Sequence, residues 1–360
     1  MIYYATDSNT RTTTYSIFMF SAVLMQSILA LSFKSLNSQL FFLDISSVSA
    51  FTIFAVSFLV YDKYVWNRGI GWLRFSTIPD FSGEWVGYID ERQEFAQLGN
   101  TFVKKTQQLV AVQLHVSQTF RKISVNLKSM AISHSAKSRE SECTTAGVFA
   151  EDSRRPKLVY TWIRSDLAGS GEFVRKAEGE RVFLDGHYQS NYPRSGTIRV
   201  IQKQPGEQWF CGQVTTIENG EGEAYLGIHI PESALLPALK LMRGFLQEPE
   251  YGQFRLAQNS RDSGGFHMTI FDPAEFNSRR NPDLENYINQ TFLWLRLIGL
   301  GKQSSGSDEC YFCVIECEGA QKIRRNCGFG NRDMHATLGF KSIDLHNVPK
   351  GTNTMIAPMR

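Results

Sequence analysis

The chain has 360 residues, which leaves room for two or three domains. Its 42% content of apolar residues is ordinary for proteins with packed cores, and the sequence contains no low-complexity tract. A formal net charge of +3 gives no argument for or against nucleic acid as a partner. Composition therefore excludes a low-complexity chain, and local patterns must indicate the function.

Two uncharged apolar stretches lie near the N-terminus. The first, Thr12 to Phe33, is long enough to cross a bilayer as a helix. A cleaved signal peptide is the alternative, but no basic segment precedes the stretch and no small-x-small site ends it. The second stretch, Ile45 to Tyr61, is followed directly by Lys63 and further basic residues. By the positive-inside tendency, we predict a two-helix transmembrane hairpin at residues 12–66 with both ends in the cytoplasm.

Other features of these stretches bear on the same prediction. Aromatic side chains that follow the second stretch are expected to form an interfacial belt: Tyr61, Tyr64, Trp66 and Trp72. Serine and other small polar residues inside the stretches favour close helix–helix contact and hint at self-association. A helical hairpin buried in a soluble protein is the alternative.

Residues 79–204 show period-two alternation with turn signals, which predicts a small antiparallel β-barrel or sandwich. A barrel of about eight strands can hold one small ligand. On one strand, alternation places Tyr160, Trp162 and Arg164 on the same face. Because aromatic rings stack on bases and arginine pairs with phosphate, we predict that this face lines the ligand site. The alternative is that Trp162 belongs to the barrel core.

Four further residues of this region are candidates for the ligand site. They lie on the last strand and on an earlier one: Thr197, Arg199, Ser133 and Ser135. Residues 205–223 contain Pro, Gly and Glu around one short strand-like piece, and we predict a linker or an extra strand there.

The order of motifs in the N-terminal part resembles a family of bacterial proteins. YDKYVWN follows the hairpin, IPDFSGEWVGYI opens the barrel region, and LDGHYQSN with RSGTI closes it. These motifs resemble the two-transmembrane β-barrel (S-2TMβ) effectors of CBASS-type anti-phage defence, over roughly residues 12–203. The resemblance implies a cytoplasmic barrel that binds a cyclic oligonucleotide. It also implies a multi-pass protein of the bacterial inner membrane that assembles into a homo-oligomer and disrupts the bilayer, with its C-terminal domains in the cytoplasm.

Two copies of a His-x-Thr pattern lie in strand-like runs of the C-terminal part. His267 and Thr269 lie in GFHMTIFDP, and His335 and Thr337 lie in DMHATLGF. Positions two apart in a strand point to the same face, so each imidazole is predicted to lie beside its hydroxyl. Ala336 is predicted to turn into the packing behind the second pair.

The double pattern resembles the two-histidine (2H) phosphoesterases, over roughly residues 224–355. The resemblance implies an α+β domain in which the two motifs face each other across a groove. The continuation FKSIDLHNVPKG resembles the branch of that family in which Asp-x-His follows the second motif, and Asp344 and His346 could orient it. Arg324 and Arg325 either add positive potential near the site or belong to a solvated surface, and His229 is predicted to be structural.

The chemistry of such a site needs a base on one side of phosphorus and an acid on the other. Two imidazoles with an ordinary pKa near 6.5 suit both tasks. The threonine hydroxyls would hold the non-bridging oxygens of the phosphate. No metal or cofactor is required, and the sequence indicates none. Which histidine is the acid depends on the direction of the substrate.

Six cysteines are spread unevenly, with Cys310 and Cys313 in a Cys-x-x-Cys arrangement. This spacing invites a zinc or redox interpretation, but no second pair stands at ligand spacing. We expect structural thiols in a reducing compartment.

Together these patterns predict a multidomain protein: a two-helix transmembrane hairpin, a small antiparallel β-barrel and an α+β 2H phosphoesterase-like domain. We expect a membrane-anchored defence effector whose barrel binds a cyclic oligonucleotide and whose 2H domain cleaves phosphodiesters. The first substrate that we expect for the 2H domain is the cyclic oligonucleotide signal. Two alternatives stay open. The 2H domain could cleave RNA or process RNA ends, or it could be catalytically dead and serve as a binding module.

Overall fold

The structure is a computed structural model of the chain. Its residues fall into two compact units. One unit contains residues 1–83, 115–126 and 141–186, and the other contains residues 84–114, 127–140 and 187–360. The residues that the structure describes are 1–6, 10–36, 49–70, 73–74, 76, 78–95, 104–130, 139–149, 155–164, 167–191, 194–218, 222–278, 282–346 and 348–359.

Two helices near the N-terminus contact each other: α1 (Thr10–Leu36) and α2 (Ala50–Val60). Ser49 caps α2, because its hydroxyl accepts a hydrogen bond from the Thr52 amide at 3.2 Å. Within α1, Arg11–Ser32 is long and apolar enough to cross a membrane, and only 11% of its most apolar window is buried. The 11 residues of α2 are too few to span alone, so a two-span hairpin is not confirmed.

The predicted interfacial belt is wrong for two of its four aromatic residues. A π-helical turn, η2 (Tyr61–Val65), continues α2, and there Tyr61 is buried against Phe18 and Phe120. Trp66 is also buried in the protein, whereas Tyr64 is exposed. Trp72 lies outside the described residues. The aromatic rings at the C-terminal end of α2 therefore pack against neighbouring residues of the same unit.

Asp62, in the π-helical turn η2, binds the turn between β5 (Lys104–Gln118) and β6 (Lys122–Met130). Its carboxylate accepts hydrogen bonds from the Arg121 amide at 2.9 Å and from Arg121 Nη2 at 3.2 Å. Its carbonyl oxygen accepts a third, from the Phe120 amide, at 3.1 Å. These contacts hold the turn against the end of the helix pair.

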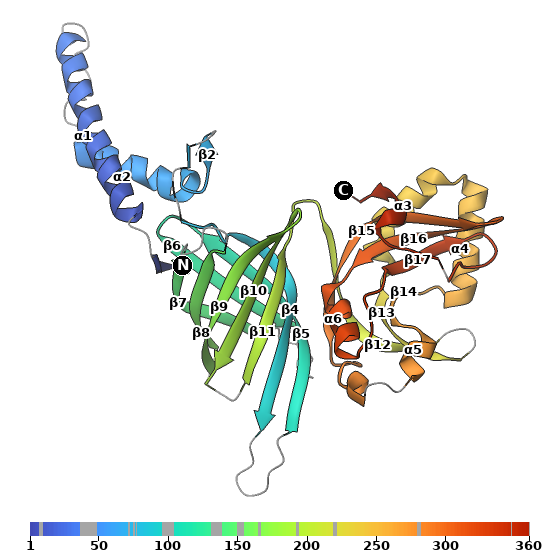
Figure 1. Ribbon diagram of the computed structural model, residues 1–360. Coiled ribbons are helices and arrows are strands. Elements are labelled where there is room, and N and C mark those ends of the chain that lie inside the picture. Colours follow the sequence, from blue (N-terminus) through green and yellow to red (C-terminus); the bar gives the residue numbers. More distant parts are fainter. Residues whose placement is uncertain are drawn as a thin grey trace, which may run out of the picture. The chain divides into compact units, whose positions relative to one another are not determined.

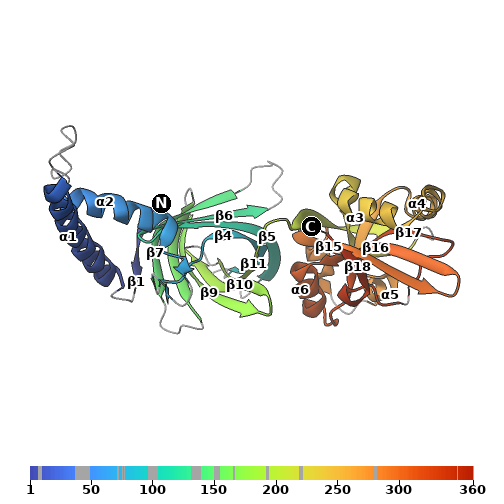
Figure 2. The same ribbon diagram turned by 90° about the horizontal axis from the view of Figure 1, so that it is seen from above.

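Among the described residues, nine strands form a closed barrel, in which β1 pairs parallel with β7 and antiparallel with β6. The order around the barrel is β1-β6-β5-β4-β11-β10-β9-β8-β7 (Figures 1 and 2). A separate two-stranded ribbon, β2 (Gly69–Ile70) with β3 (Leu73–Arg74), precedes it in the sequence. The remaining barrel strands are β1 (Ile2–Thr6), β4 (Gly83–Phe95), β7 (Arg139–Phe149), β8 (Lys157–Arg164), β9 (Leu167–Glu178), β10 (Arg181–Ser190) and β11 (Arg194–Gln202).

Strand β1 was not predicted from the sequence, which is merely polar around it. It pairs with both β6 and β7, which also pair with each other, and so joins the closed barrel as a further strand. Its Tyr4 side chain is buried, and the hydroxyl lies 3.0 Å from the Phe120 carbonyl oxygen and 3.2 Å from Gln118 Nε2. A pairing that joins residues more than a hundred positions apart leaves no local pattern in the sequence.

The C-terminal sheet has the order β14-β13-β12-β15-β16-β17, and β18 pairs with β15 beside this path. Its first strand in the sequence, β12 (Gln208–Glu218), pairs with both β13 and β15. The strand-like piece of residues 205–223 therefore occupies the middle of the sheet. The other strands are β13 (Ala224–Ile230), β14 (Phe266–Phe271), β15 (Phe292–Ser305), β16 (Asp308–Glu316), β17 (Met334–Phe340) and β18 (Met355–Pro358).

Helices flank this sheet and complete one hydrophobic core with it (Figure 2). The amphipathic helix α3 (Glu232–Phe245) buries Leu235, Leu239 and Met242. α4 (Glu248–Asp262), which was not predicted from the sequence, packs against β17. The shorter helical elements are α5 (Pro273–Asn277), η3 (Pro282–Asn286), α6 (Glu318–Asn326) and η4 (Thr352–Thr354).

Candidate active site

The first His-x-Thr pair lies on β14, at one end of the sheet. His267 is directly opposite His229 of β13, and Thr269 is opposite Gly227. A side chain on Gly227 would meet the Met268 carbonyl oxygen at 2.7 Å, so this position needs glycine. Tyr225, two residues earlier on β13, reaches across so that its hydroxyl lies 3.0 Å from His267 Nε2. Burial raises the pKa of Tyr225 to about 12, so the hydroxyl keeps its proton. It can therefore donate a hydrogen bond to a neutral imidazole.

The second pair lies on β17, at the other end. His335 is opposite Val314 of β16, and Thr337 is opposite Phe312. The Phe312 ring meets the His335 ring edge-on, with centroids 5.7 Å apart. Ala336 between them is buried in the core, as predicted. Strand alternation thus separates the imidazole and hydroxyl from the packed face.

Both motifs end in the same backbone irregularity. The pairing register shifts directly after Thr269 and directly after Thr337, so that Ile270 and Leu338 are extra residues in their strands. Both extra residues are buried. β-bulges re-aim side chains beside functional sites. Although β14 and β17 are the two ends of the sheet order, they contact each other, and this brings the two motifs to one site.

A buried cluster of charges lies at this site, centred on Asp344. Its carboxylate accepts hydrogen bonds from Lys350 Nζ at 3.0 Å, from Thr337 Oγ1 at 3.4 Å and from Arg261 Nη1. Arg261 also pairs with its neighbour Asp262 at 2.7 Å. The side chains of Asp344 and Lys350 are each only 3% exposed. Burial opposes the charge of Asp344, but Lys350 and Arg261 hold the pKa of this carboxyl well below its usual range.

The two histidines have depressed pKa values for the same main reason. Burial lowers the pKa of His267, and Arg261 and His229 lower it further against the opposing effects of Asp262 and Asp344. Burial lowers the pKa of His335 to about 3, with Lys350 adding to the shift and Asp344 opposing it. Asp344 thus acts electrostatically on both imidazoles, which are neutral at pH 7 in this state.

Comparison with known proteins agrees with this geometry. Residues 224–346 match the family model described as Swiss Army Knife, 2H phosphoesterase domain. The C-terminal part of the chain contains a 2H phosphoesterase domain. No curated protein matches the chain.

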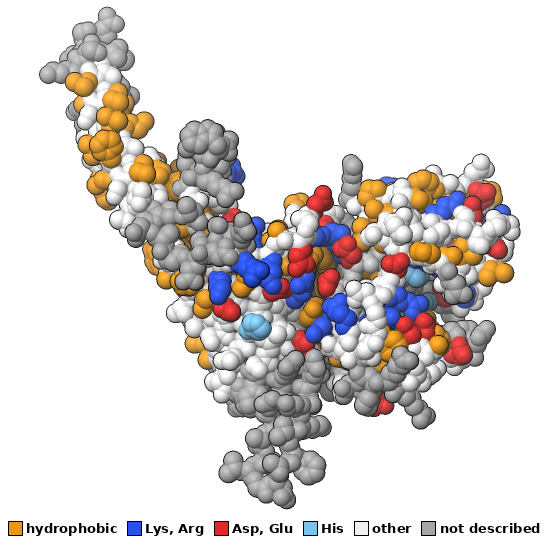
Figure 3. Space-filling view, viewed as in Figure 1, with side chains coloured by type: hydrophobic (Ala, Val, Ile, Leu, Met, Phe, Trp, Pro, Cys, Tyr) orange, Lys and Arg blue, Asp and Glu red, His pale blue; other side chains and the backbone are white. Residues whose placement is uncertain are grey.

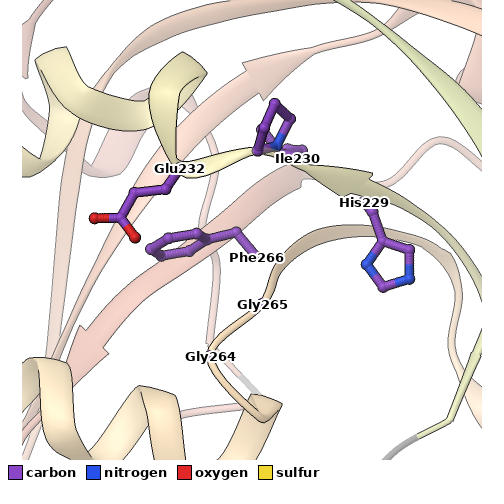
Figure 4. Close-up of a pocket in the computed structure, with 7 residues that line it drawn as sticks. His229, Ile230, Glu232, Gly264, Gly265 and Phe266 are labelled. Atoms are coloured by element: carbon purple, nitrogen blue, oxygen red, sulfur yellow. The ribbon is translucent and has the colours of Figure 1, made fainter.

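The 2H domain has a pocket next to His267, at the ends of β13 and β14. It has a volume of about 360 Å³ and is lined by His229, Glu232, Phe266 and the glycines of the turn before β14 (Figure 4). His229 is exposed there, and its assignment as a structural residue stays a prediction. The end of an apolar strand gives no sign of what lies opposite in the sheet, so the sequence did not show that His229 faces His267.

Other predicted site residues of the 2H domain lie elsewhere. Arg324 is not on a solvated surface: it is buried and forms a bidentate pair with Glu275, with both distances 2.8 Å. Arg325 binds Asn331 at 3.0 Å. His346 is exposed, with Nδ1 4.0 Å from Asp344, whereas Asp344 contacts the second motif through Thr337. Only the acidic residue of the Asp-x-His pair therefore touches the motif.

The structure separates the residues predicted to line the barrel. Tyr160 and Trp162 lie on the same face of β8 as the buried Leu158, and the Tyr160 ring stacks on Phe173 with centroids 5.1 Å apart. The side chain of Arg164 lies outside the described residues, as do Ser133 and Ser135.

The two candidates on β11 point the other way. Thr197 and Arg199 alternate with the buried Ile198 and Val200, and Thr197 is exposed. Alternation therefore puts Thr197 and Arg199 on the opposite face from the packed interior, and the structure does not bring them together with Tyr160 and Trp162.

The cysteines are free thiols, and Cys310, Cys313, Cys317 and Cys327 are buried. Burial raises the pKa of Cys313 and of Cys317 to about 12. Among the described residues, no group of three His, Cys, Asp or Glu side chains is arranged to hold a metal ion.

Proposed function

We propose that the 2H domain cleaves phosphodiesters by acid–base catalysis with His267 and His335. Thr269 and Thr337 would hold the non-bridging oxygens, where negative charge builds up in the transition state. The observation that carries this proposal is the contact between the end strands β14 and β17, each with one His-x-Thr pair and a bulge directly after it.

In the reaction, one imidazole takes the proton of the attacking hydroxyl or water. The new phosphorus–oxygen bond forms as the bond to the leaving oxygen breaks, and the second imidazole gives that oxygen its proton. The acid must be protonated beforehand, although burial lowers the pKa of both histidines. A bound phosphate anion opposes this shift, because a nearby negative charge favours the imidazolium form.

We further propose that the protein is an anchored effector whose barrel binds a cyclic oligonucleotide. Support for anchoring comes from α1, which exposes large apolar side chains such as Phe20 and Leu31. Apolar side chains show along this helix in Figure 3. Support for the ligand is the resemblance of residues 12–203 to effector sequences, together with the aromatic face of β8. The 2H domain would then open the cyclic signal and limit the response.

The test uses purified full-length protein in detergent with cyclic di- and trinucleotides, and separately with linear RNA. Cleavage of a cyclic oligonucleotide that His267→Asn and His335→Asn both lose would support the proposal. Cleavage of RNA alone would indicate the RNA-processing alternative. Binding of a cyclic oligonucleotide without cleavage of any substrate would leave the domain as a binding module and contradict the catalytic proposal.

A growth assay separates the first two outcomes in cells. If the 2H domain removes the activating signal, the histidine variants should harm cells more than the wild type when the signal is supplied, because the signal persists. If the domain produces the toxicity, the same variants should protect the cells.

A further inference from the structure

Three groups suited to binding phosphate converge on the carboxylate of Asp344. Oδ1 accepts a hydrogen bond from Lys350 Nζ, and Oδ2 accepts hydrogen bonds from Arg261 Nη1 and Thr337 Oγ1. Arginine and lysine are the principal phosphate-binding cations of proteins. Thr337 is the hydroxyl to which the proposed mechanism assigns a phosphate oxygen. The Asp344 carboxylate therefore lies among the same kinds of hydrogen-bond donors that bind phosphate in proteins.

We propose that Asp344 occupies the position of the substrate's phosphate, and that Arg261, Lys350 and Thr337 bind the phosphodiester once it displaces this carboxylate. The inference rests on the proposed phosphodiesterase function and adds two phosphate-binding residues and an internal competitor to it. Lys350 lies beyond the 224–346 region that matches the family, and neither cation belongs to a His-x-Thr motif.

The exchange conserves charge and donor geometry. A phosphodiester carries one negative charge and two non-bridging oxygens, as the carboxylate does. One oxygen would take the place of Oδ1 on Lys350, and the other would take the place of Oδ2 on Arg261 and Thr337. Lys350, with 3% of its side chain exposed, would be a buried cation without this carboxylate, which is costly, so departure of Asp344 is favourable only when another anion arrives.

The position of Asp344 in the chain permits such a displacement. It lies in the connection after β17, between Phe340 and η4, and its described residues form neither helix nor strand. Asp344 also influences the pKa of both His267 and His335, as a phosphate bound between them would. Its neighbours Ile343 and His346 are exposed, whereas Leu345 packs against a small apolar cluster and Lys350 is buried, so the connection is only partly exposed.

The simplest alternative is that Asp344 only positions Arg261 and Lys350 for catalysis. The two roles predict opposite effects of Asp344→Asn, which keeps the shape of the side chain and removes its charge. A competitor lowers the apparent affinity for phosphate by the fraction of molecules in which the site is open. Removing its charge should therefore tighten phosphate binding, whereas removing a positioning group should weaken it.

The experiment measures binding of inorganic phosphate to full-length protein in detergent by titration calorimetry. We expect Asp344→Asn to bind phosphate about tenfold more tightly than the wild type, and Lys350→Met and Arg261→Met to bind it at least about tenfold more weakly. The control is Asp185→Asn in the barrel, where the lost carboxylate pairs with Lys176 at 2.7 Å and phosphate affinity should not change.

Asp344→Asn removes the counter-charge of the buried Lys350 and one of the two carboxylates that pair with Arg261, and can lower stability. Thermal unfolding with and without phosphate keeps the test informative, because a ligand stabilises the fold according to its affinity. Phosphate should raise the Tm of Asp344→Asn more than that of the wild type. Equal or weaker binding by Asp344→Asn, or no phosphate binding by any variant, would overturn the proposal.

Because the readout is binding, it is independent of catalysis. Tighter phosphate binding by Asp344→Asn in a protein that cleaves no phosphodiester would keep the competitor role and reject the proposed function. Normal phosphodiester cleavage, with an unchanged phosphate affinity in Asp344→Asn, would keep the proposed function and reject the competitor role.

Discussion

His229 lies directly opposite His267 in the antiparallel pairing of β13 and β14, so two imidazoles stand side by side on one face of the sheet. The second imidazole, when protonated, repels a proton on the first, and it adds to the burial that lowers the pKa of His267. His229 also lines the pocket of the 2H domain. His229 is therefore expected to tune the proton affinity of His267.

Replacing His229 with Asn should raise the pKa of His267 toward its ordinary value, because one of the groups that depress it is lost. An NMR titration of the His267 ring protons measures this directly. His115→Asn, which removes an exposed histidine of β5, is the control and should leave the His267 titration unchanged. A fall in the His267 pKa in His229→Asn would contradict the assignment.

Stability of the 2H domain should fall with acid in a window set by His335. The pKa of this buried imidazole is about 3 in the folded chain and near 6.5 when unfolded. Between these values the unfolded state binds more protons, so stability decreases as pH falls through the window, by at most about 1.4 kcal/mol per pH unit. His335→Asn should flatten this dependence in denaturant unfolding at pH 4 to 7. An unchanged slope would show that His335 titrates normally.

The sequence predicts the local part of the site well and its long-range part poorly. His267 with Thr269, and His335 with Thr337, were identifiable because spacing within one strand fixes which side chains share a face. Arg261 and Lys350 were not identifiable, since they reach Asp344 only through the tertiary fold. His229 was missed for the same reason, because strand register depends on the pairing of two segments far apart in the sequence.

The fold shows the same division. Alternation indicated the barrel strands and the His-x-Thr strands, but no local pattern showed that β1 belongs to the barrel or that β12 joins the two halves of the C-terminal sheet. The residues of β11 were assigned to the inner face although the buried Ile198 and Val200 alternate with them. A single strand's pattern gives two faces and leaves open which of them is inside.

Tyr225→Phe should lower the turnover number by roughly tenfold, with little change in KM. The variant removes the hydroxyl that lies 3.0 Å from His267 Nε2 and leaves that nitrogen buried without this partner, a loss of about 1–2 kcal/mol. Tyr251→Phe, which removes a hydroxyl from α4 of the same domain, is the control. Steady-state kinetics with a cleavable phosphodiester gives the turnover number and KM of each variant. A change in KM alone would mean that Tyr225 contacts the substrate and does not orient His267.

Asp62→Ala should destabilise the junction between α2 and the β5–β6 turn. The change removes the acceptor of the Arg121 amide and guanidinium hydrogen bonds, and since Arg121 is one-third exposed we expect a loss of about 1–3 kcal/mol. Unfolding followed by the fluorescence of the buried Trp66 reports on this region. Asp80→Ala, whose carboxylate binds the exposed Asn67, is the control and should cost less. Equal losses for both variants would show that the Asp62 contacts add nothing.

His267 and His335 are proposed to act on one phosphodiester. The decisive measurement is single-turnover cleavage by full-length wild type, His267→Asn, His335→Asn and the double variant. Each single change should slow cleavage by about 10²–10⁴-fold, and the double change should add little, because both act in one transition state. Wild-type rates in either single variant, or losses that multiply in the double variant, would contradict the claim.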